Sequence, residues 1–252
     1  MKLSIIVSIF NSHEIVRRQF LHFERIGVPD DVEILYMDDE SSSPLKYTGD
    51  LKNLHIIPVN NTNFRHRDKG MFADGRVSVA RNLGARLAKG EFLLMTDIDY
   101  IITRDSIEAG RNLKYDKQGF RRQFGVLDEN GVLTQNLDVL RKYGLLEERI
   151  QRGLLFSPHP NNFIMRKTTF FDIGGYRESK ADNEYPSGGD RWFKRDWSTY
   201  YQAGKATLSP DRTHLFMFPN GQWCGDVDYN PFGLFHPLSR KTQSNHWYTK
   251  KK

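Results

Sequence analysis

Cysteine is almost absent from this chain, since Cys224 is the only one among 252 residues. No disulfide can form within the chain, which is typical of proteins from a reducing compartment, and we expect a cytoplasmic location. Long hydrophobic runs are also absent, and no segment approaches the roughly 20 apolar residues that a membrane-spanning helix needs. The apolar residues 3–10 are followed at once by polar ones, without a small-residue cleavage site, so they predict a strand rather than a signal peptide.

The rest of the composition is that of a globular protein. Hydrophobic residues make up 38% of the chain, which argues against wholesale disorder, and the length suffices for one large α/β domain. The formal net charge of +6 favours phosphates, nucleotides, nucleic acid or anionic membrane surfaces without choosing among them. Aromatic residues reach 13% and fit either a bulky core or stacking sites for bases and sugars.

The first hundred residues alternate between strand and helix patterns. Strands are predicted at residues 3–9, 32–37, 54–59 and 92–95, and helices from Ser12 to about Ile26 and from Val77 to Leu87. This order predicts a mostly parallel sheet with helices packed on it. In such sheets the loops at the carboxyl ends of the strands build the binding site. Polar residues fall at three of those ends: Asn11, Asp38-Asp39 and Asp97-Ile98-Asp99.

Periodicity is weaker after Asp99. Helices are predicted at residues 106–113, 137–150 and 191–201, a strand at 162–165, a helical turn at 168–171 and a polar loop at 176–189. The segment beyond Asp211 is rich in aromatic residues, proline and glycine and has no regular period. Since no repeat or linker divides the chain, we expect a single domain over residues 1–252.

The Asp97-Ile98-Asp99 tripeptide predicts a metal or nucleotide site. It directly follows the apolar strand 92–95, which makes a merely solvated surface turn a weaker explanation. Two carboxylates one residue apart supply the hard oxygen ligands with which Mg²⁺ or Mn²⁺ bridges a protein to substrate phosphates. The neighbouring acids Asp38-Asp39 are ambiguous by themselves, because they fit a cap for the following turn as well as a contact to a nucleotide base.

Several separate blocks of sequence resemble family 2 glycosyltransferases. Residues 3–12 resemble the opening strand of that family, and residues 33–42 resemble its second strand with a D-D/G-S ending. The blocks Ala80-Arg81-Asn82-Leu83-Gly84, Ala88-Lys89-Gly90-Glu91 and Asp97-Ile98-Asp99 are similar to the A-R-N-x-G, A-x-G-E and D-x-D series. The resemblance is strongest over residues 1–105. It returns at residues 173–178, which resemble the G-G-F/Y-x-E segment before the acceptor site.

The resemblance implies an α/β protein of the GT-A fold that binds a nucleoside-diphosphate sugar. Residues 1–105 would form the nucleotide-sugar-binding half, and residues 106–252 the acceptor-binding half with a C-terminal segment. Asp39 matches the acid that reads the donor base, and Ser8 lies near it in the family pattern. Asn11, at the end of the first predicted strand, is expected to join the same donor site.

The resemblance also assigns the charged positions around the donor. Arg81 matches the basic position that faces the nucleotide, and Asp97 matches the acid near the ribose and the metal. Asp99 matches the acid that coordinates the metal directly, which is expected to be Mn²⁺ or Mg²⁺. A late histidine sometimes completes the metal site of the family, and His236 is the candidate. His214 and His246 are the alternative candidates for this metal ligand.

Inverting members of the family carry Glu-Asp after the Gly-Gly segment, and that Asp is the catalytic base. Here the matching place reads Gly188-Gly189-Asp190-Arg191-Trp192, so the Asp is present and the Glu is not. A carboxylate at that place can take the proton of the acceptor hydroxyl as its oxygen attacks the anomeric carbon. Asp190 also fits a helix N-cap, and Asp182 and Asp196 are alternative bases. Trp192 and Trp197 fit either sugar stacking or core packing.

The expected function is metal-dependent transfer of a sugar, with inversion, from a nucleoside-diphosphate sugar to an acceptor hydroxyl. A UDP-sugar is the favoured donor, because Asp39 would pair with an imide N–H such as uracil offers, and the acceptor would be a carbohydrate or a lipid-linked one. One alternative has the acceptor on DNA, as a hydroxymethylated base, which the basic composition suits but no DNA-binding motif supports. Another is a non-catalytic module that binds nucleotide-sugars.

Overall fold

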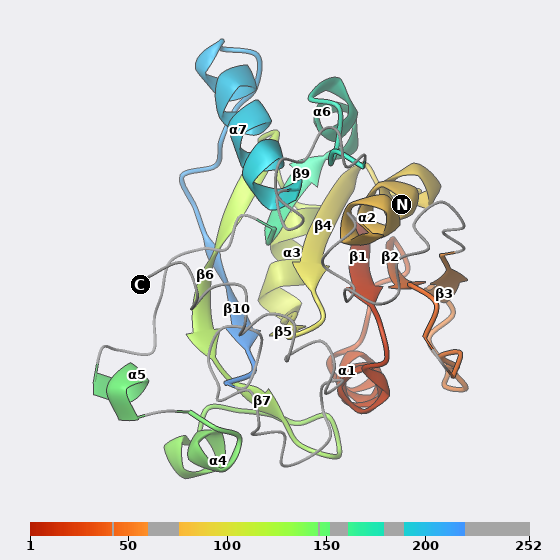
Figure 1. The fold of residues 1–252 in the computed structure, drawn as a ribbon, viewed down its shortest axis with the longest axis vertical. Helices are drawn as coiled ribbons and strands as arrows, with labels where there is room; N and C mark the ends of the chain where they lie inside the picture. Colours follow the sequence, from red (N-terminus) through yellow and green to blue (C-terminus); the bar gives the residue numbers. More distant parts are fainter. Residues whose placement is uncertain (42, 60–75, 146, 152–160, 179–188, 220–252) are drawn as a thin grey trace, which may run out of the picture.

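The computed structural model describes residues 1–41, 43–59, 76–145, 147–151, 161–178 and 189–219 (Figure 1). Its central sheet has eight strands in the order β3-β2-β1-β4-β9-β6-β10-β5. The strands, including a separate hairpin of β7 and β8, are β1 (Leu3–Ile9), β2 (Val32–Asp38), β3 (Leu54–Pro58), β4 (Phe92–Asp97), β5 (Tyr100–Ile101), β6 (Lys117–Phe124), β7 (Val126–Leu127), β8 (Leu133–Thr134), β9 (Phe163–Arg166) and β10 (Thr213–Met217). The described helices are α1 (His13–Ile26), α2 (Arg76–Leu87), α3 (Arg104–Arg111), α4 (Leu137–Lys142), α5 (Glu147–Gln151), α6 (Lys167–Asp172) and α7 (Gly189–Gln202).

The predicted parallel half of the sheet is confirmed. β1 lies between β2 and β4 and is parallel to both, and β3 is parallel to β2. β9 then runs antiparallel between β4 and β6. The carboxyl ends of β1, β2 and β4 therefore meet at one edge, as the sequence predicts.

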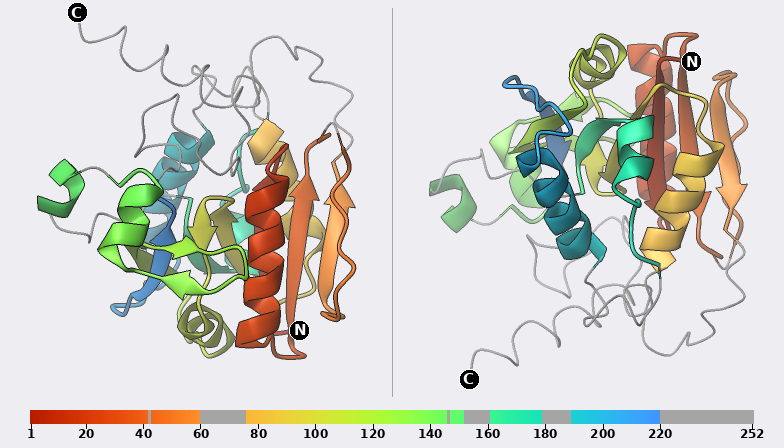
Figure 2. Two further views of the ribbon diagram at one scale, coloured as in Figure 1. Left: turned by 90° about the horizontal axis from the view of Figure 1, so that it is seen from below. Right: turned by 90° about the horizontal axis from the view of Figure 1, so that it is seen from above.

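Alternate residues of each strand feed two different cores. Leu3, Ile5 and Val7 of β1 pack with α1 and α3, whereas Ile6 packs with α2, α6 and α7. In Figure 2 α1 and α3 lie on one side of the sheet and α2, α6 and α7 on the other. We call these the α1/α3 face and the α2/α7 face. Because side chains alternate along a strand, neighbouring residues serve different faces.

Helix α2 packs close to the sheet. A Cβ atom at Gly84 would lie 2.7 Å from a methyl carbon of Ile6, so only glycine allows α2 this approach to β1. The close packing brings the side chain of Arg81, one turn earlier, over the carboxyl end of the parallel strands.

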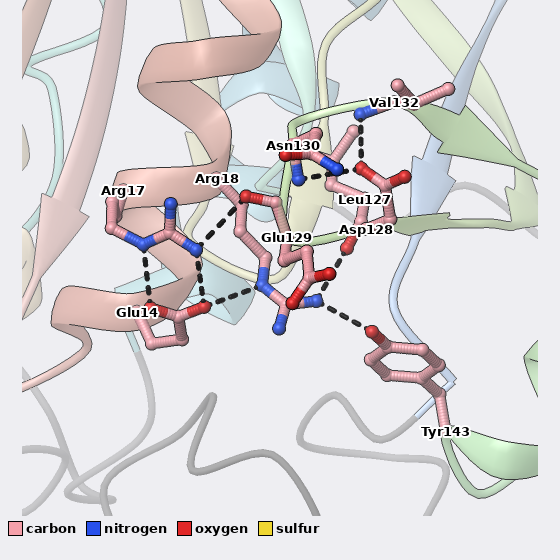
Figure 3. A network of polar contacts seen from close by, with 9 residues as sticks. All are labelled: Glu14, Arg17, Arg18, Leu127, Asp128, Glu129, Asn130, Val132 and Tyr143. Atoms are coloured by element: carbon pink, nitrogen blue, oxygen red, sulfur yellow. Dashed lines mark hydrogen bonds and ion pairs between the residues drawn. The ribbon is translucent and has the colours of Figure 1, made fainter.

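An insertion between β6 and β9 carries the β7–β8 hairpin, α4 and α5 (Figure 1). The buried guanidinium of Arg18 on α1 donates to the carbonyl of Leu127 at 2.9 Å and to the hydroxyl of Tyr143 at 2.6 Å (Figure 3). Arg17 donates to the carbonyl of Glu129 at 3.1 Å, and both arginines pair with Glu14. α1 therefore anchors the insertion through side chain to main chain contacts.

Several sequence-based expectations need correction. The single helix expected at 137–150 is two helices, because Gly144 has a φ of 91° and ends the first. β6 was not expected, since its sequence mixes charged and apolar residues without a clear period, and β10 was not expected because it lies in the segment beyond Asp211 that has no regular period. Ser12 is the N-cap of α1 as expected, but its hydroxyl donates to the Phe10 carbonyl and accepts no bond from the helix. Within the described ranges, no helix is both long and apolar enough to span a membrane.

Candidate functional site

Backbone strain marks the carboxyl ends of β1 and β2. Asn11 has a φ of 48° and Glu40 a φ of 56°, a region that residues other than glycine seldom adopt. The two loops touch, because the amide of Asn11 donates to the hydroxyl of Ser41 at 2.9 Å. Such strain is typical of functional sites, where the surrounding structure maintains it.

The adjacent acids Asp38 and Asp39 have different roles. Asp38 accepts bonds from the amides of Ser41 and Leu45, each at 3.1 Å, so its carboxylate shapes the loop after β2. Asp39 continues the alternation of Leu35 and Met37 on the α2/α7 face and is 2% exposed. The turn-capping interpretation of this pair therefore applies to Asp38.

Arg81 joins two carboxylates from distant parts of the chain. Its Nη2 pairs with Oδ1 of Asp97 at the end of β4, and its Nη1 lies 3.5 Å from Oδ1 of Asp190 on α7. The side chain is 2% exposed, whereas those of Asp97 and Asp190 are 25% and 35% exposed. A buried cation thus holds two partly accessible carboxylates together, which the sequence-based assignment of Arg81 to the nucleotide did not include.

The electrostatics of this cluster favour a fixed positive charge. Burial opposes ionisation of Arg81, but the charge of Asp97, followed by Tyr176 and Asp190, outweighs it and raises the pKa of Arg81. The guanidinium carbon lies 5.2 Å from the centroid of the Tyr176 ring, a cation–π arrangement. The carboxylates of Asp97 and Asp190 thus share the guanidinium of Arg81.

Asn82 explains why the A-R-N block and the Gly-Gly-Tyr block occur together. Its side-chain amide donates to the carbonyl of Tyr176 at 2.7 Å and accepts from the amide of the same residue at 2.9 Å. Gly175, which precedes this pair, has a φ of 64°, a conformation that favours glycine. The two blocks thus form one structural unit, with the Tyr176 ring beneath Arg81.

Asp190 lies in the first turn of α7, not before it. The helix begins at Gly189, so the N-cap interpretation of Asp190 is wrong. A Cβ atom at Gly189 would lie 2.4 Å from the hydroxyl of Ser78 on α2, so this glycine lets the two helices approach closely. The contact places Asp190 next to Arg81. An acid in the first helical turn is also favoured by the helix dipole.

Ser8 and Asp97 lie side by side in the parallel pairing of β1 with β4, both on the α2/α7 face. The Ser8 hydroxyl is buried and lacks a hydrogen-bond partner among the described residues, as does Nε of Arg81. Buried polar atoms of this kind usually mark a site for a ligand or water. Asp99 follows at the turn and is 6% exposed.

The donor set fits a hard divalent cation that takes further ligands from a substrate. Asp97 and Asp99 supply carboxylate oxygens, as Mg²⁺ and Mn²⁺ prefer. In the part of the chain that the structure describes, no group of three or more His, Cys, Asp or Glu side chains could hold a metal by itself. Asp97 pairs with Arg81, and Asp99 is the residue that the sequence assigns to direct coordination. His236 and its rival His246 lie outside the described residues.

The remaining candidates have mainly structural surroundings. Trp197 is buried, whereas Trp192 is partly exposed and its ring lies near the guanidinium groups of Arg177 and Arg195. Asp196 pairs with Arg177 at 3.1 Å. His214 lies on β10, and the alternative base Asp182 lies outside the described residues.

Asn162 was missed in the sequence. It is 2% exposed, and its side-chain oxygen accepts a bond from the main-chain amide of Asp97 at 3.4 Å. Its side-chain nitrogen is buried without a partner among the described residues. The only sequence signal was a polar residue at the start of a predicted strand opposite the D-x-D motif.

No protein-family model and no curated protein sequence matches the chain. Among solved structures, S. aureus TarS 1-349 in complex with UDP matches with a TM-score of 0.51 and 18% identity, over 86% of this chain and 60% of that one. The same protein in complex with UDP-GlcNAc gives 0.51 and 17% identity, over 86% and 58%. The mannosyltransferase PcManGT from Pyrobaculum calidifontis, in complex with GDP-Man and Mn²⁺, matches at 0.49 and 16% over 88% and 58%, which is too low to support an argument.

TarS is a GT-A-type glycosyltransferase, and the mostly parallel curled sheet with flanking helices is that fold. The predicted fold class is therefore confirmed. This chain spans about 60% of the TarS chain that it matches.

Proposed function

We propose that the protein transfers a sugar from a nucleoside-diphosphate sugar to an acceptor hydroxyl, with inversion at the anomeric carbon. The observation that carries the proposal is the guanidinium of Arg81, which brings Asp97 of the D-x-D motif and Asp190 of α7 to one place. This contact supports a single site that contains a donor-side acid and a candidate base from distant parts of the sequence. The GT-A-type fold supports this reaction class.

Each residue has a role in the proposed reaction. Asp39 and Ser8, with Asn11, hold the donor nucleotide, and a UDP-sugar is favoured. The bound Mn²⁺ or Mg²⁺ would neutralise the diphosphate as it leaves, and Asp99, with Asp97, would hold that ion. The TarS complexes with UDP and UDP-GlcNAc support a uridine donor at the level of the fold.

Asp190 is proposed to be the base. Its carboxylate takes the proton of the acceptor hydroxyl while that oxygen bonds to the anomeric carbon and the bond from that carbon to the diphosphate breaks. Arg81 keeps Asp190 oriented. We propose a carbohydrate or lipid-linked acceptor, bound by the half of the chain after residue 105, and the single cysteine supports a cytoplasmic location.

Donor binding can be tested without knowledge of the acceptor. Thermal unfolding is measured with UDP-, GDP-, dTDP- and CDP-sugars, each with and without Mn²⁺. A ligand that binds only the folded protein raises the melting temperature by mass action. We expect the largest rise with a UDP-sugar and Mn²⁺ together. If no nucleotide-sugar changes the melting temperature under either condition, the proposal is wrong.

A further inference from the structure

The segment that carries the D-x-D motif ends at an open sheet edge. β5 directly follows Asp99 and is the last strand in the order of the eight-stranded sheet, where it pairs with β10. On the β10 side, the amide of Phe218 donates to the carbonyl of Asp99 at 3.0 Å. Among the described residues, no strand pairs with the opposite edge of β5, so the carbonyl groups there need other donors.

Side chains of α1 supply those donors. The amide nitrogen of Gln19 donates to the carbonyl of Ile98 at 2.8 Å and to that of Tyr100 at 3.0 Å. One helical turn later, a ring nitrogen of His22 lies 3.0 Å from the carbonyl of Ile102. The carbonyls of residues 98, 100 and 102 are therefore contacted from one face of α1, which takes the place of a neighbouring strand.

Gln19 is itself fixed in place. It is 4% exposed, and its side-chain oxygen accepts a bond from the hydroxyl of Tyr36 at 2.7 Å. Tyr36 lies on β2 and is fully buried. The three contacts of the Gln19 side chain come from two segments, β2 and the segment that carries the D-x-D motif. Its orientation is therefore determined, and with it the carbonyls on both sides of Asp99.

We infer that Gln19 is a positioning residue for the metal-binding carboxylate of Asp99, with Tyr36 holding Gln19 in turn. This inference rests on the proposed function. Gln19 does not touch the substrate; it fixes the backbone on either side of Asp99, and the direction of the carboxylate follows from that backbone. Residues that orient metal ligands in this way typically change metal affinity or activity by about 10- to 100-fold when they are replaced.

The experiment measures Mn²⁺ affinity in the presence of UDP, by electron paramagnetic resonance of free Mn²⁺, together with the melting temperature. Gln19→Met keeps the size of the side chain and removes its hydrogen bonds. We expect a roughly tenfold or greater loss of Mn²⁺ affinity. Tyr36→Phe removes only the hydroxyl that orients Gln19, so a smaller loss in the same direction is expected.

Tyr143→Phe is the matched control. It removes the buried Tyr143 hydroxyl, which accepts a bond from another α1 side chain, Arg18. Arg18 also donates to the hairpin carbonyl of Leu127. Its Mn²⁺ affinity should remain within about twofold of the wild type, even if its melting temperature falls as much as that of Tyr36→Phe.

Two results would overturn the inference while leaving the proposed function intact. One is unchanged Mn²⁺ affinity in both Gln19→Met and Tyr36→Phe; the other is an equal loss in Tyr143→Phe. If Gln19→Met does not fold, the two tyrosine variants decide. A wild-type protein that binds no Mn²⁺ in the presence of UDP refutes the proposed metal site and this inference together.

Discussion

The two faces of the central sheet use buried polar residues differently. On the α2/α7 face, charged groups contact one another: Arg81 is shared by Asp97 and Asp190. On the α1/α3 face, Gln19 and Arg18 donate to main-chain carbonyls of segments far away in sequence, and Arg18 also pairs with Glu14. Side chains held by ion pairs can rearrange when a charged substrate binds. Side chains that donate to main-chain carbonyls instead fix the position of a segment. We therefore expect the first face to carry the proposed chemistry and the second to support it.

The D-x-D motif lies where the two faces meet. Asp97 pairs with Arg81 on the α2/α7 face, and the next carbonyl, that of Ile98, is held by Gln19 from the α1/α3 face. Variants on the chemical face should lose activity with little loss of stability. Variants on the supporting face should lose stability as well.

The largest effect is expected for Asp99→Ala. Without the carboxylate that is proposed to hold the metal, Mn²⁺-dependent turnover should fall to the background rate, while the fold persists. The measurement is release of nucleoside diphosphate from the donor identified by thermal shift, with and without Mn²⁺, together with circular dichroism. Asp105→Ala, which removes an exposed acid on α3, is the control and should retain full turnover. Near wild-type activity of Asp99→Ala in Mn²⁺ would refute the metal assignment.

Asp190→Asn should reduce turnover by about a hundred- to ten-thousand-fold, because a general base typically contributes that much. Donor affinity should change little, since Asp39, Ser8 and the metal are proposed to hold the donor. Turnover is measured at saturating donor, and the anomeric configuration of the product by NMR.

Asp196→Asn is the matched control on the same helix, because Asp196 also pairs with an arginine, Arg177. It should keep normal turnover. Normal turnover in Asp190→Asn would instead exclude Asp190 as the base, and retention of anomeric configuration would exclude a single displacement.

The adjacent acids after β2 give the sharpest comparison of the two faces. Asp39→Ala should weaken donor binding by roughly tenfold, the effect of losing one charge-assisted hydrogen bond to a base, with little change in melting temperature. Asp38→Ala should lower the melting temperature with little change in donor affinity, because Asp38 accepts bonds from the amides of Ser41 and Leu45. Calorimetry with the donor and thermal unfolding measure both. Equal donor affinities in the two variants would remove the distinction between them.

The sequence was sufficient for the parallel half of the sheet because its strands are almost purely apolar and end in polar residues. It was insufficient for β6, where Arg121 is exposed and Arg122 donates to the hydroxyl of Tyr100. Charged residues interrupt the alternating pattern that predicts a strand. Their partners lie far away in the sequence, so the local sequence does not reveal them.

The same limit applies to the candidate site. Asp97 and Asp99 could be identified because they directly follow a buried strand. Gln19 reads in the sequence as an ordinary polar residue of a helix, and its partner carbonyls are 79 and 81 residues away. The pairing of Arg81 with Asp190 likewise depends on the close approach of α7 to α2 at Gly189 and Ser78.

Lys117 is an exception to the division between the faces, because it is a cation of the α2/α7 face without an assigned chemical role. Its ammonium lies 4.5 Å from the ring centroid of Trp197 and 4.8 Å from that of Phe163. Burial, with a smaller contribution from Lys194, lowers the pKa of Lys117 from 10.5 to about 7. The aromatic ring faces act in the opposite direction, since they favour the charged form.

The smallest effect follows from this lowered pKa. Between pH 7 and 10.5 the unfolded chain keeps the Lys117 proton and the folded protein releases it, so the free energy of unfolding rises with pH across this window. Lys117→Met lacks this dependence. The variant should therefore be more stable than the wild type by about 1–2 kcal/mol at pH 7, allowing for the cation–π contacts, and the gap should narrow as the pH rises.

Urea unfolding at pH 7 and pH 9.5 measures the difference in free energy of unfolding between Lys117→Met and the wild type. Lys114→Met, at an exposed position, controls for the loss of a surface charge. A gap that stays constant with pH would mean that the rings keep Lys117 charged. In that case the α2/α7 face would hold a second fixed cation, beneath the helix that carries Asp190. This result would strengthen the contrast between the two faces, because Lys117, like Arg81, would then be a buried positive charge on the α2/α7 face.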